Sequence, residues 1–211
     1  MIELNNVVKK FDNRMILSNL SLSIAKNEFV CITGESGSGK TTLLNIIGLL
    51  EQPDDGQVIL EGKHYFSKKD ILKLRQEYFG YIFQDYLLMQ EKTVEENLSV
   101  SKVYCKNLEK DSLNKALESV GLSALYLKQK VYQLSGGEQQ KVAIARMMLK
   151  PCELILADEP TGNLDEKNKK EIIALFKTLQ QSGKTIVCVT HDKEVSQSAD
   201  RIIHLKKFHE I

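Results

Sequence analysis

Apolar residues follow two different periods along this chain, and their order predicts an α/β fold. Within residues 20–24, apolar and polar residues alternate, as in a strand with one exposed face. Phe29–Thr33 is a continuous apolar run, as in a buried parallel strand. A short apolar run at 57–60 predicts a strand in a hairpin. Further apolar runs predict strands at 81–83, 153–157, 185–190 and 201–205. Helical patterns cover 40–50, about 67–77 and about 166–181. Strands that alternate with helices indicate a mainly parallel sheet with helices on both faces.

The middle of the chain has a different pattern. From about Tyr86 to Gln133 helical periodicity dominates, and Gly121 is well placed to end one of the helices. We therefore expect a helical lobe inserted at about 86–140. With an antiparallel β lobe near the N-terminus and an α/β core, the pattern predicts a single domain over residues 1–211.

Composition narrows the choice of partners. The 211 residues are 42% hydrophobic, enough for one substantial core, and a net charge of +1 gives no electrostatic reason to expect a nucleic-acid partner. Residues 1–10 are charged and alternating, so we expect no signal peptide, and the longest apolar stretch, 43–50, is far shorter than the roughly 20 residues that span a bilayer. A membrane role would therefore require a partner. Four dispersed cysteines indicate a reduced, intracellular protein: Cys31, Cys105, Cys152 and Cys188.

A glycine-rich segment follows the apolar strand Phe29–Thr33. Residues 34–41 fit G-x-x-x-x-G-K-[ST], the P-loop or Walker A pattern. Its glycines let backbone N–H groups converge on phosphate oxygens, and the helix that follows adds its N-terminal dipole. We expect Lys40 to reach the β- and γ-phosphates and Thr41 to ligate Mg²⁺. The candidate ATP-binding residues of this segment are Gly34, Glu35, Ser36, Gly37, Ser38, Gly39, Lys40, Thr41 and Thr42.

Paired carboxylates end the predicted strand 153–157, as in a Walker B motif. Asp158 stands at the carboxyl end of that strand, where it can hold Mg²⁺ through water beside the P-loop. Glu159 is one residue further on, and because successive side chains diverge, it can point to the γ-phosphate and polarise a water molecule. This pair predicts a magnesium carboxylate and a general base.

Both motifs also have plain structural interpretations. A glycine-rich turn matches the P-loop pattern by chance in roughly one chain of this length in a hundred. The strand before it and the helix after it favour nucleotide binding. An acidic turn after a strand would be as good an interpretation of Asp158 and Glu159, but the P-loop upstream makes it the weaker one.

Residues 134–140 (LSGGEQQ) carry a resemblance to a known family. A Ser-Gly-Gly sequence that opens a helix presents backbone N–H groups, a hydroxyl and a helix dipole to an anion. An ordinary helix N-cap at Ser135 would leave the full seven-residue match unexplained. The segment resembles the LSGGQ signature of ATP-binding cassette (ABC) ATPases, a class of P-loop NTPases, and the resemblance covers nearly the whole chain.

The other sequence elements of that family occur in the same order. Gln84 is similar to the Q-loop glutamine, residues 162–165 to the D-loop, and His191 to the switch histidine. Phe11 falls where the family has an aromatic ring that stacks on adenine, although tyrosine is commoner there. Lys141 stands where arginine is usual, which loses a bidentate donor but no catalytic group.

The resemblance implies an ATPase mechanism in which two cassettes pair head to tail around two ATP molecules. ATP and Mg²⁺ are the implied cofactors. The implied catalytic residues are Glu159 as general base, His191, Gln84 and Lys40, and the implied Mg²⁺ residues are Thr41, Gln84 and Asp158. Further implied ATP contacts, several of them across the dimer, are Phe11, Ser135, Gly136, Gly137, Glu138 and Asp165.

Within the family, residues 158–165 (DEPTGNLD) resemble the group of lipoprotein-releasing, macrolide and antimicrobial-peptide (bacteriocin) exporting, and FtsE-like cell-division cassettes. This implies an ATP-hydrolysing subunit that energises export or extraction of a peptide, lipoprotein or drug-like substrate through a separate integral membrane permease subunit. It would be a homodimer in the ATP-bound state, peripheral on the cytoplasmic face of the cell membrane. The surface around 84–89 and the helical lobe would receive that subunit.

Two other functions stay open from the sequence. An FtsE-like mechanotransmission ATPase would drive a membrane partner without transport, and this chain alone does not distinguish it from an exporter. An ABC protein that acts on DNA or ribosomes is the weaker alternative. Such proteins carry coiled coils, zinc modules or a second cassette, and this chain shows none of these patterns.

Overall fold

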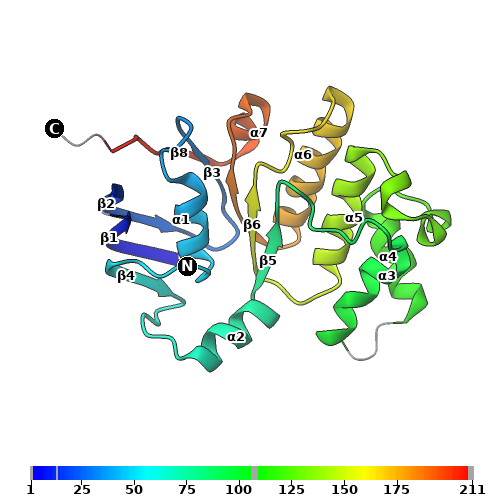
Figure 1. The fold of residues 1–211 in the computed structure, drawn as a ribbon, viewed down its shortest axis with the longest axis horizontal. Coiled ribbons are helices and arrows are strands. Elements are labelled where there is room, and N and C mark those ends of the chain that lie inside the picture. The colour runs from blue at the N-terminus through cyan, green and yellow to red at the C-terminus, as the bar shows by residue number, and fades with distance from the viewer. Residues whose placement is uncertain (1, 13, 106–108, 209–211) are drawn as a thin grey trace.

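The computed structural model describes residues 2–12, 14–105 and 109–208 of the chain. It contains a three-stranded sheet, a five-stranded sheet and a helical lobe on the far side of the second sheet (Figure 1). Residues 1, 13, 106–108 and 209–211, which belong to the predicted domain 1–211, lie outside the described part. The expected fold class, an α/β P-loop NTPase core with an antiparallel β lobe and an inserted helical lobe, is confirmed.

The smaller sheet is antiparallel, and β1 (Ile2–Phe11) lies at its centre. Its neighbours are β2 (Arg14–Ile24) and β4 (Asp55–Leu60), so Ile2 pairs with Ile24 on one side and with Leu60 on the other. The strand predicted at 57–60 is β4, which pairs with β1, and an antiparallel bridge between Leu60 and Lys63 closes the turn that follows it. Ile2 and Leu4 of β1 bring an apolar face to the core.

The larger sheet is parallel, with strand order β5-β6-β7-β3-β8. The five strands are β3 (Phe29–Thr33), β5 (Phe79–Ile82), β6 (Leu154–Asp158), β7 (Thr185–Val189) and β8 (Arg201–His204). All lie within about two residues of the apolar runs that predicted them. Because β3, β7 and β6 are neighbours, the loops that follow them meet at one edge of the sheet, where ligands of parallel sheets bind.

Among the described residues, four helices belong to the core: α1 (Lys40–Ile47), α2 (Lys68–Glu77), α6 (Glu166–Gln181) and α7 (Lys193–Ser198). The helical lobe contains α3 (Val94–Ser99), α4 (Lys110–Ser119) and α5 (Gly136–Met148) with the short 3₁₀ helices Val100–Val103, Ala124–Lys128 and Val131–Gln133. A capping box of Ser67 and Asp70 begins α2, and Gly183 follows the end of α6 with a positive φ. Helix α7 was not predicted, because six residues are too short for a periodic signal.

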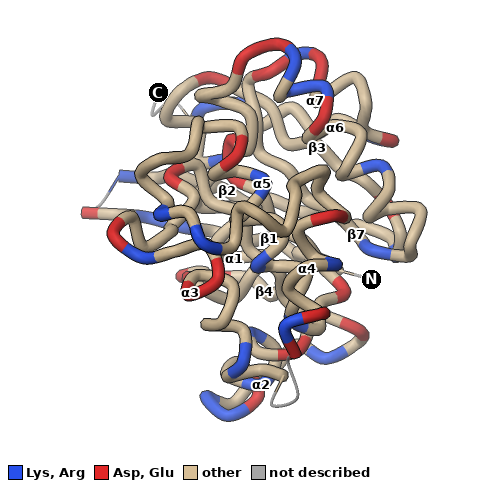
Figure 2. Tube along the Cα trace, turned by 90° about the vertical axis from the view of Figure 1, so that its right-hand side faces the viewer, with Lys and Arg blue, Asp and Glu red and all other residues tan. Residues whose placement is uncertain are grey.

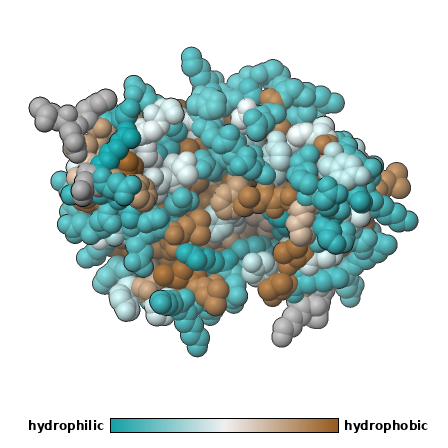
Figure 3. Space-filling model, in the orientation of Figure 1, coloured by the Kyte–Doolittle hydropathy of each residue, from teal (hydrophilic) through white to brown (hydrophobic). Residues whose placement is uncertain are grey.

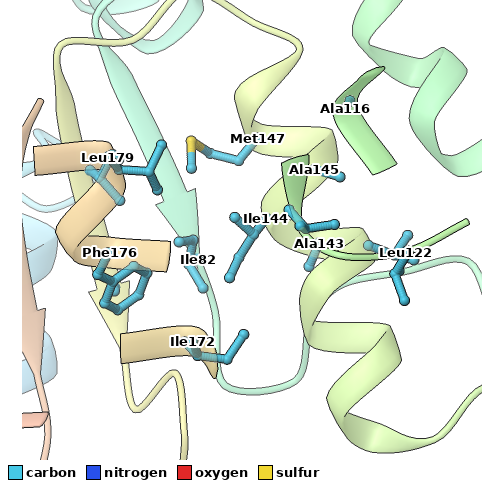
Figure 4. Close-up of a cluster of buried hydrophobic side chains, with 14 of the residues drawn as sticks. Ile82, Ala116, Leu122, Ala143, Ile144, Ala145, Met147, Ile172, Phe176 and Leu179 are labelled. Carbon is cyan, nitrogen blue, oxygen red and sulfur yellow. The ribbon is translucent and has the colours of Figure 1, made fainter. Parts of the chain in front are cut away.

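Helix α5 attaches the helical lobe to the core. Figure 4 shows Ile144 and Met147 of α5 directed toward Ile82 of β5 and toward α6. Within the same cluster, Phe176 of α6 is fully buried and packs edge-on against Phe29, with ring centroids 6.0 Å apart. The position of α5, and of the signature segment at its N-terminus, is therefore set by a continuous apolar contact with the sheet.

The surface carries both signs of charge. Figure 2 shows basic and acidic residues interspersed along the trace, and their numbers nearly balance, with a net charge of +1. In the described ranges 2–12, 14–105 and 109–208, no helix has the length and apolar character needed to cross a membrane.

Candidate nucleotide site

The P-loop connects β3 to α1 and is closely packed against the β lobe. Gly39 precedes the first residue of α1 with a φ of 93°, a left-handed conformation that favours glycine. A Cβ atom there would also lie 2.7 Å from Cγ2 of Ile16 on β2, which is too close for any other residue. Lys40 folds over the loop, and its Nζ donates to the carbonyls of Gly34 at 3.0 Å and Glu35 at 2.9 Å. The loop is thus held in the curled form that directs N–H groups to an anion.

A cavity of about 390 Å³ opens beside this loop and brings together residues of three sheet loops and the β lobe. Nine of its lining residues were predicted as site residues: Ser36, Gly37, Gly39, Lys40, Thr41, Thr42, Gln84, Asp158 and Glu159. Arg14, Ile16 and Val189 also line the cavity and were missed. Arg14 and Ile16 reach the site because β2 packs against the P-loop, where Ile16 lies beside Gly39.

Asp158 and Thr41 are the candidate Mg²⁺ residues at this cavity, and they share a hydrogen bond. Burial raises the pKa of the Asp158 carboxyl above its usual value, and a hydrogen bond with Thr41 opposes part of that rise. Among the described residues no group of three or more His, Cys, Asp and Glu side chains could hold a metal. Mg²⁺ does not need such a group when it binds together with phosphates, because the phosphates supply part of its coordination. One carboxylate and one hydroxyl beside the P-loop are then suitable oxygen donors from the protein. The donor set therefore fits Mg²⁺ bound together with a nucleotide.

Glu159 and His191 are in direct contact at the ends of β6 and β7. Oε2 of Glu159 lies 3.0 Å from Nδ1 of His191 and accepts from the backbone N–H of His191 at 3.3 Å. The backbone of Glu159 has a φ of 45°, and its own N–H donates to the carbonyl of Val189 at 2.9 Å. This uncommon conformation directs the carboxylate to the cavity, where it can accept a proton from water.

The signature segment lies elsewhere. Ser135 caps α5, and its Oγ and backbone N–H both donate to the carboxylate of Glu138 at 2.8 Å. The Tyr126 hydroxyl donates to the same carboxylate at 2.6 Å, and this bond is the largest cause of the lowered pKa of Glu138. The Glu138 side chain therefore stabilises the start of α5, and none of Ser135, Gly136, Gly137 and Glu138 lines the phosphate cavity of the same chain.

Asp165 and Phe11 also lie outside that cavity. Asp165 caps α6 and accepts from the backbone N–H and side-chain amide of Asn168 at 2.8 and 2.9 Å, which lowers its pKa. Asn168 in turn packs against Gly137, where a Cβ atom would lie 2.7 Å from Nδ2 of Asn168. Phe11 ends β1 with 45% of its surface exposed and with Nζ of Lys9 5.1 Å from the ring centroid. Most of the predicted residues thus form two groups, one at the cavity and one at the start of α5 and α6, whereas Phe11 lies apart from both at the end of β1.

This arrangement of P-loop, paired carboxylates and separate signature helix is that of an ABC ATPase. The family model "ABC transporter" matches residues 17–162, and the chain belongs to that family. The lipoprotein-releasing system ATP-binding protein LolD of Aquifex aeolicus is 41% identical over 211 residues, which cover 98% of this chain and 94% of that protein. The macrolide export ATP-binding/permease protein MacB of Campylobacter jejuni is 44% identical over 98% of this chain and 33% of its own length.

Solved structures agree with this assignment. The dimeric structure of MJ0796, a bacterial ABC transporter cassette, is 38% identical with a TM-score of 0.87, covering 98% of this chain and 94% of that one. A post-hydrolysis structure of the same cassette, bound to ADP and Pi, also has a TM-score of 0.87. The predicted ATPase class is confirmed. The chain spans about a third of the length of the MacB relatives that it matches.

Proposed function

We propose that two copies of this chain close around two ATP molecules and thereby drive a membrane partner. The observation that carries the proposal is the separation of the two groups of site residues. The cavity contains Lys40, Asp158 and Glu159, whereas Ser135 lies outside it. The start of α5 can bind an anion, but it does not line the phosphate cavity of its own chain. The phosphate that it contacts would therefore be bound in the cavity of a second chain. The solved structure of the similar cassette MJ0796 is dimeric, which supports the proposal.

Each residue then has a chemical task in the closed dimer. Lys40 would neutralise the β- and γ-phosphates, Thr41 and Asp158 would hold Mg²⁺, and Gln84 would contact the metal or the attacking water. Mg²⁺ would neutralise charge on the transferred phosphoryl group. Glu159 accepts the proton of the attacking water, and the contact with His191 orients its carboxylate. Ser135 and Asp165 of each chain complete the site of the other, and Phe11 stacks on adenine.

The membrane partner would dock in a hollow of about 200 Å³ between the core and the helical lobe. Tyr81, Val100, Tyr104 and Met147 give this hollow apolar walls. Figure 3 shows that apolar side chains also gather in the middle of the face seen in Figure 1. A cytoplasmic helix of an integral membrane permease subunit, with an apolar face and a polar rim, fits this surface. The chain would then lie on the cytoplasmic face of the cell membrane.

The relatives indicate the class of cargo. Their names include macrolide export, lipoprotein release and probable syringafactin export. Macrolides and lipoproteins are bulky molecules with large apolar parts. We infer that this chain energises export or extraction of a peptide, lipoprotein or drug-like substrate, with the cargo contacts on the membrane subunit.

A capture experiment tests this function. Tagged Glu159→Gln protein, held with ATP and Mg²⁺, is used to capture partners from detergent-solubilised native membranes, and mass spectrometry identifies them. We expect a multi-span membrane protein. Val100→Asp, inside the hollow, should lose it, whereas Leu125→Asp, at an exposed apolar residue that does not line the hollow, should retain it.

Recovery of soluble proteins or ribosomes alone would contradict the membrane role. A membrane protein captured equally well by Val100→Asp would contradict the docking surface but leave the partner class intact. The extracellular region of the captured protein would distinguish a transporter from a mechanical signalling complex.

A further inference from the structure

The turn that follows Gln84 is held in an uncommon backbone conformation. Tyr86 and Leu87 are consecutive non-glycine residues with φ values of 59° and 48°. Local hydrogen bonds tighten the turn, from Tyr86 N–H to the Phe83 carbonyl at 3.1 Å and from Leu87 N–H to the Asp85 carbonyl at 2.6 Å. Left-handed conformations are sparsely populated by such residues and persist where the surroundings hold them. The surroundings of this turn therefore decide where Gln84 lies.

Arg146, in the last turn of α5, supplies the contact that holds it. Nη1 donates to the carbonyl of Leu87 at 2.7 Å, and Nη2 donates to the carbonyl of Tyr86 at 3.0 Å. The two carbonyls thus belong to the two left-handed residues. Arg146 is half-buried, and within the described part of the chain it has no carboxylate partner. Burial lowers the pKa of its guanidinium. The two backbone carbonyls accept hydrogen bonds from this guanidinium and thereby stabilise its charge in the absence of a carboxylate.

Helix α5 contacts the same segment near its other end. A Cβ atom at Gly136 would lie 3.2 Å from the Tyr86 hydroxyl, and Nε2 of Gln90 donates to Oε1 of Gln139 at 3.2 Å. Figure 1 shows this segment leaving β5 and crossing toward the helical lobe. Contacts near both ends of α5 join the turn to the helix that carries Ser135, so a displacement of α5 would displace the turn.

We propose that Arg146 is a positioning residue that holds the turn 85–87 and thereby places Gln84 at the metal and water in the nucleotide cavity. This rests on the role proposed above for Gln84. Lysine cannot replace the guanidinium fully, because its single nitrogen has no rigid fork for two carbonyls. Arg146 also lines the docking hollow, so a partner helix seated there would touch the residue that holds the turn. The contact connects partner occupancy to Gln84.

The test measures ATPase activity against Mg²⁺ concentration for the parent, Arg146→Ala and Arg146→Lys. We expect Arg146→Ala to raise the Mg²⁺ concentration for half-maximal activity at least fivefold and to lower kcat at least tenfold. ATP binding measured by calorimetry in EDTA should stay within twofold of the parent, and Arg146→Lys should restore part of kcat. The control is Lys184→Ala, which removes another cation-to-carbonyl bond, to Cys152 at 2.6 Å, outside the nucleotide cavity. It should leave the Mg²⁺ profile unchanged.

A double-mutant cycle with Gln84→Ala separates positioning from general stability. If Arg146 acts through Gln84, Arg146→Ala lowers kcat at least tenfold in the parent. In the Gln84→Ala background the same change lowers kcat by less than twofold. Equal losses in both backgrounds would overturn the proposal. Parental activity and Mg²⁺ dependence in Gln84→Ala alone would overturn the role of Gln84 itself, which is a different failure. Arg146→Lys keeps the charge and most of the stem, so the cycle is run with it if Arg146→Ala does not fold.

Discussion

Gly137 lies where the signature helix meets the start of α6, and its replacement by alanine tests that contact. The new Cβ would lie 2.7 Å from Nδ2 of Asn168, and closer still to its Cγ, so the Asn168 side chain must rotate away. Rotation breaks the 2.9 Å bond from Asn168 to the Asp165 carboxylate. Gly137→Ala therefore separates the signature segment from the residue that would act across the dimer.

The expected change in stability follows from two opposing effects. Losing the hydrogen bond to Asp165 destabilises the variant only modestly, because this carboxylate is exposed to solvent, and the strain of moving Asn168 away from the new Cβ adds to the loss. Alanine in place of glycine gains at most about 1 kcal/mol in a helix, and less in the first turn, where residue 137 lies. We expect a net loss of stability, and for a domain of this size each kcal/mol of it lowers Tm by roughly 2–4 °C.

Circular dichroism during thermal and urea unfolding measures that loss, and a phosphate-release assay measures turnover, which we expect to fall at least tenfold. Asn168→Ala provides the control, because it removes the same bond without a clash. In the double variant Gly137→Ala/Asn168→Ala the Cβ has space, so its stability should be no lower than that of Asn168→Ala. If the two penalties simply add, the steric explanation is wrong.

Three further predictions concern the core and the cavity. Phe176→Ala should cost about 3–5 kcal/mol of unfolding free energy in urea denaturation, because the ring is fully buried against Phe29; a loss below about 1 kcal/mol would refute this packing. Lys40→Ala should weaken ATP binding at least tenfold in a calorimetric titration, since its ammonium is the cation of the P-loop, and unchanged affinity would contradict the phosphate site. Because burial raises the pKa of Asp158, the folded protein binds that proton more tightly than the unfolded chain does, and stability falls as pH rises above the usual pKa of 3.8. Asp158→Asn should therefore raise Tm of the nucleotide-free protein at pH 7, by a margin that shrinks toward pH 4; a margin independent of pH would refute the linkage.

The sequence was informative wherever a long periodic pattern or a spaced motif was present. The parallel strands followed from continuous apolar runs, and nine predicted residues meet at one cavity. Strand β1 was missed because its alternation is broken at Asn6, which has a φ of 51° and lies at a register shift against β2. A period of two that is interrupted after a few residues gives no clear strand signal.

Two features of the site depend on three-dimensional packing and had no local signal. Arg14 lines the cavity because β2 packs against the P-loop, where Ile16 lies beside Gly39. The left-handed backbone of Glu159, and of the turn that Arg146 holds, occurs at residues that do not favour it, so surrounding contacts override local preference. Such positions are the ones where propensity arguments fail and function is concentrated.

The central claim is that ATP joins two copies of this chain through the P-loop of one and the Ser135 segment of the other. Size-exclusion chromatography with light scattering on Glu159→Gln tests it most directly, with and without ATP and Mg²⁺. We expect the mass of a single chain without nucleotide and twice that mass with ATP, and no dimer when Lys40→Ala is added. A Glu159→Gln protein that binds ATP at the affinity of the parent and still has the mass of one chain would contradict the claim.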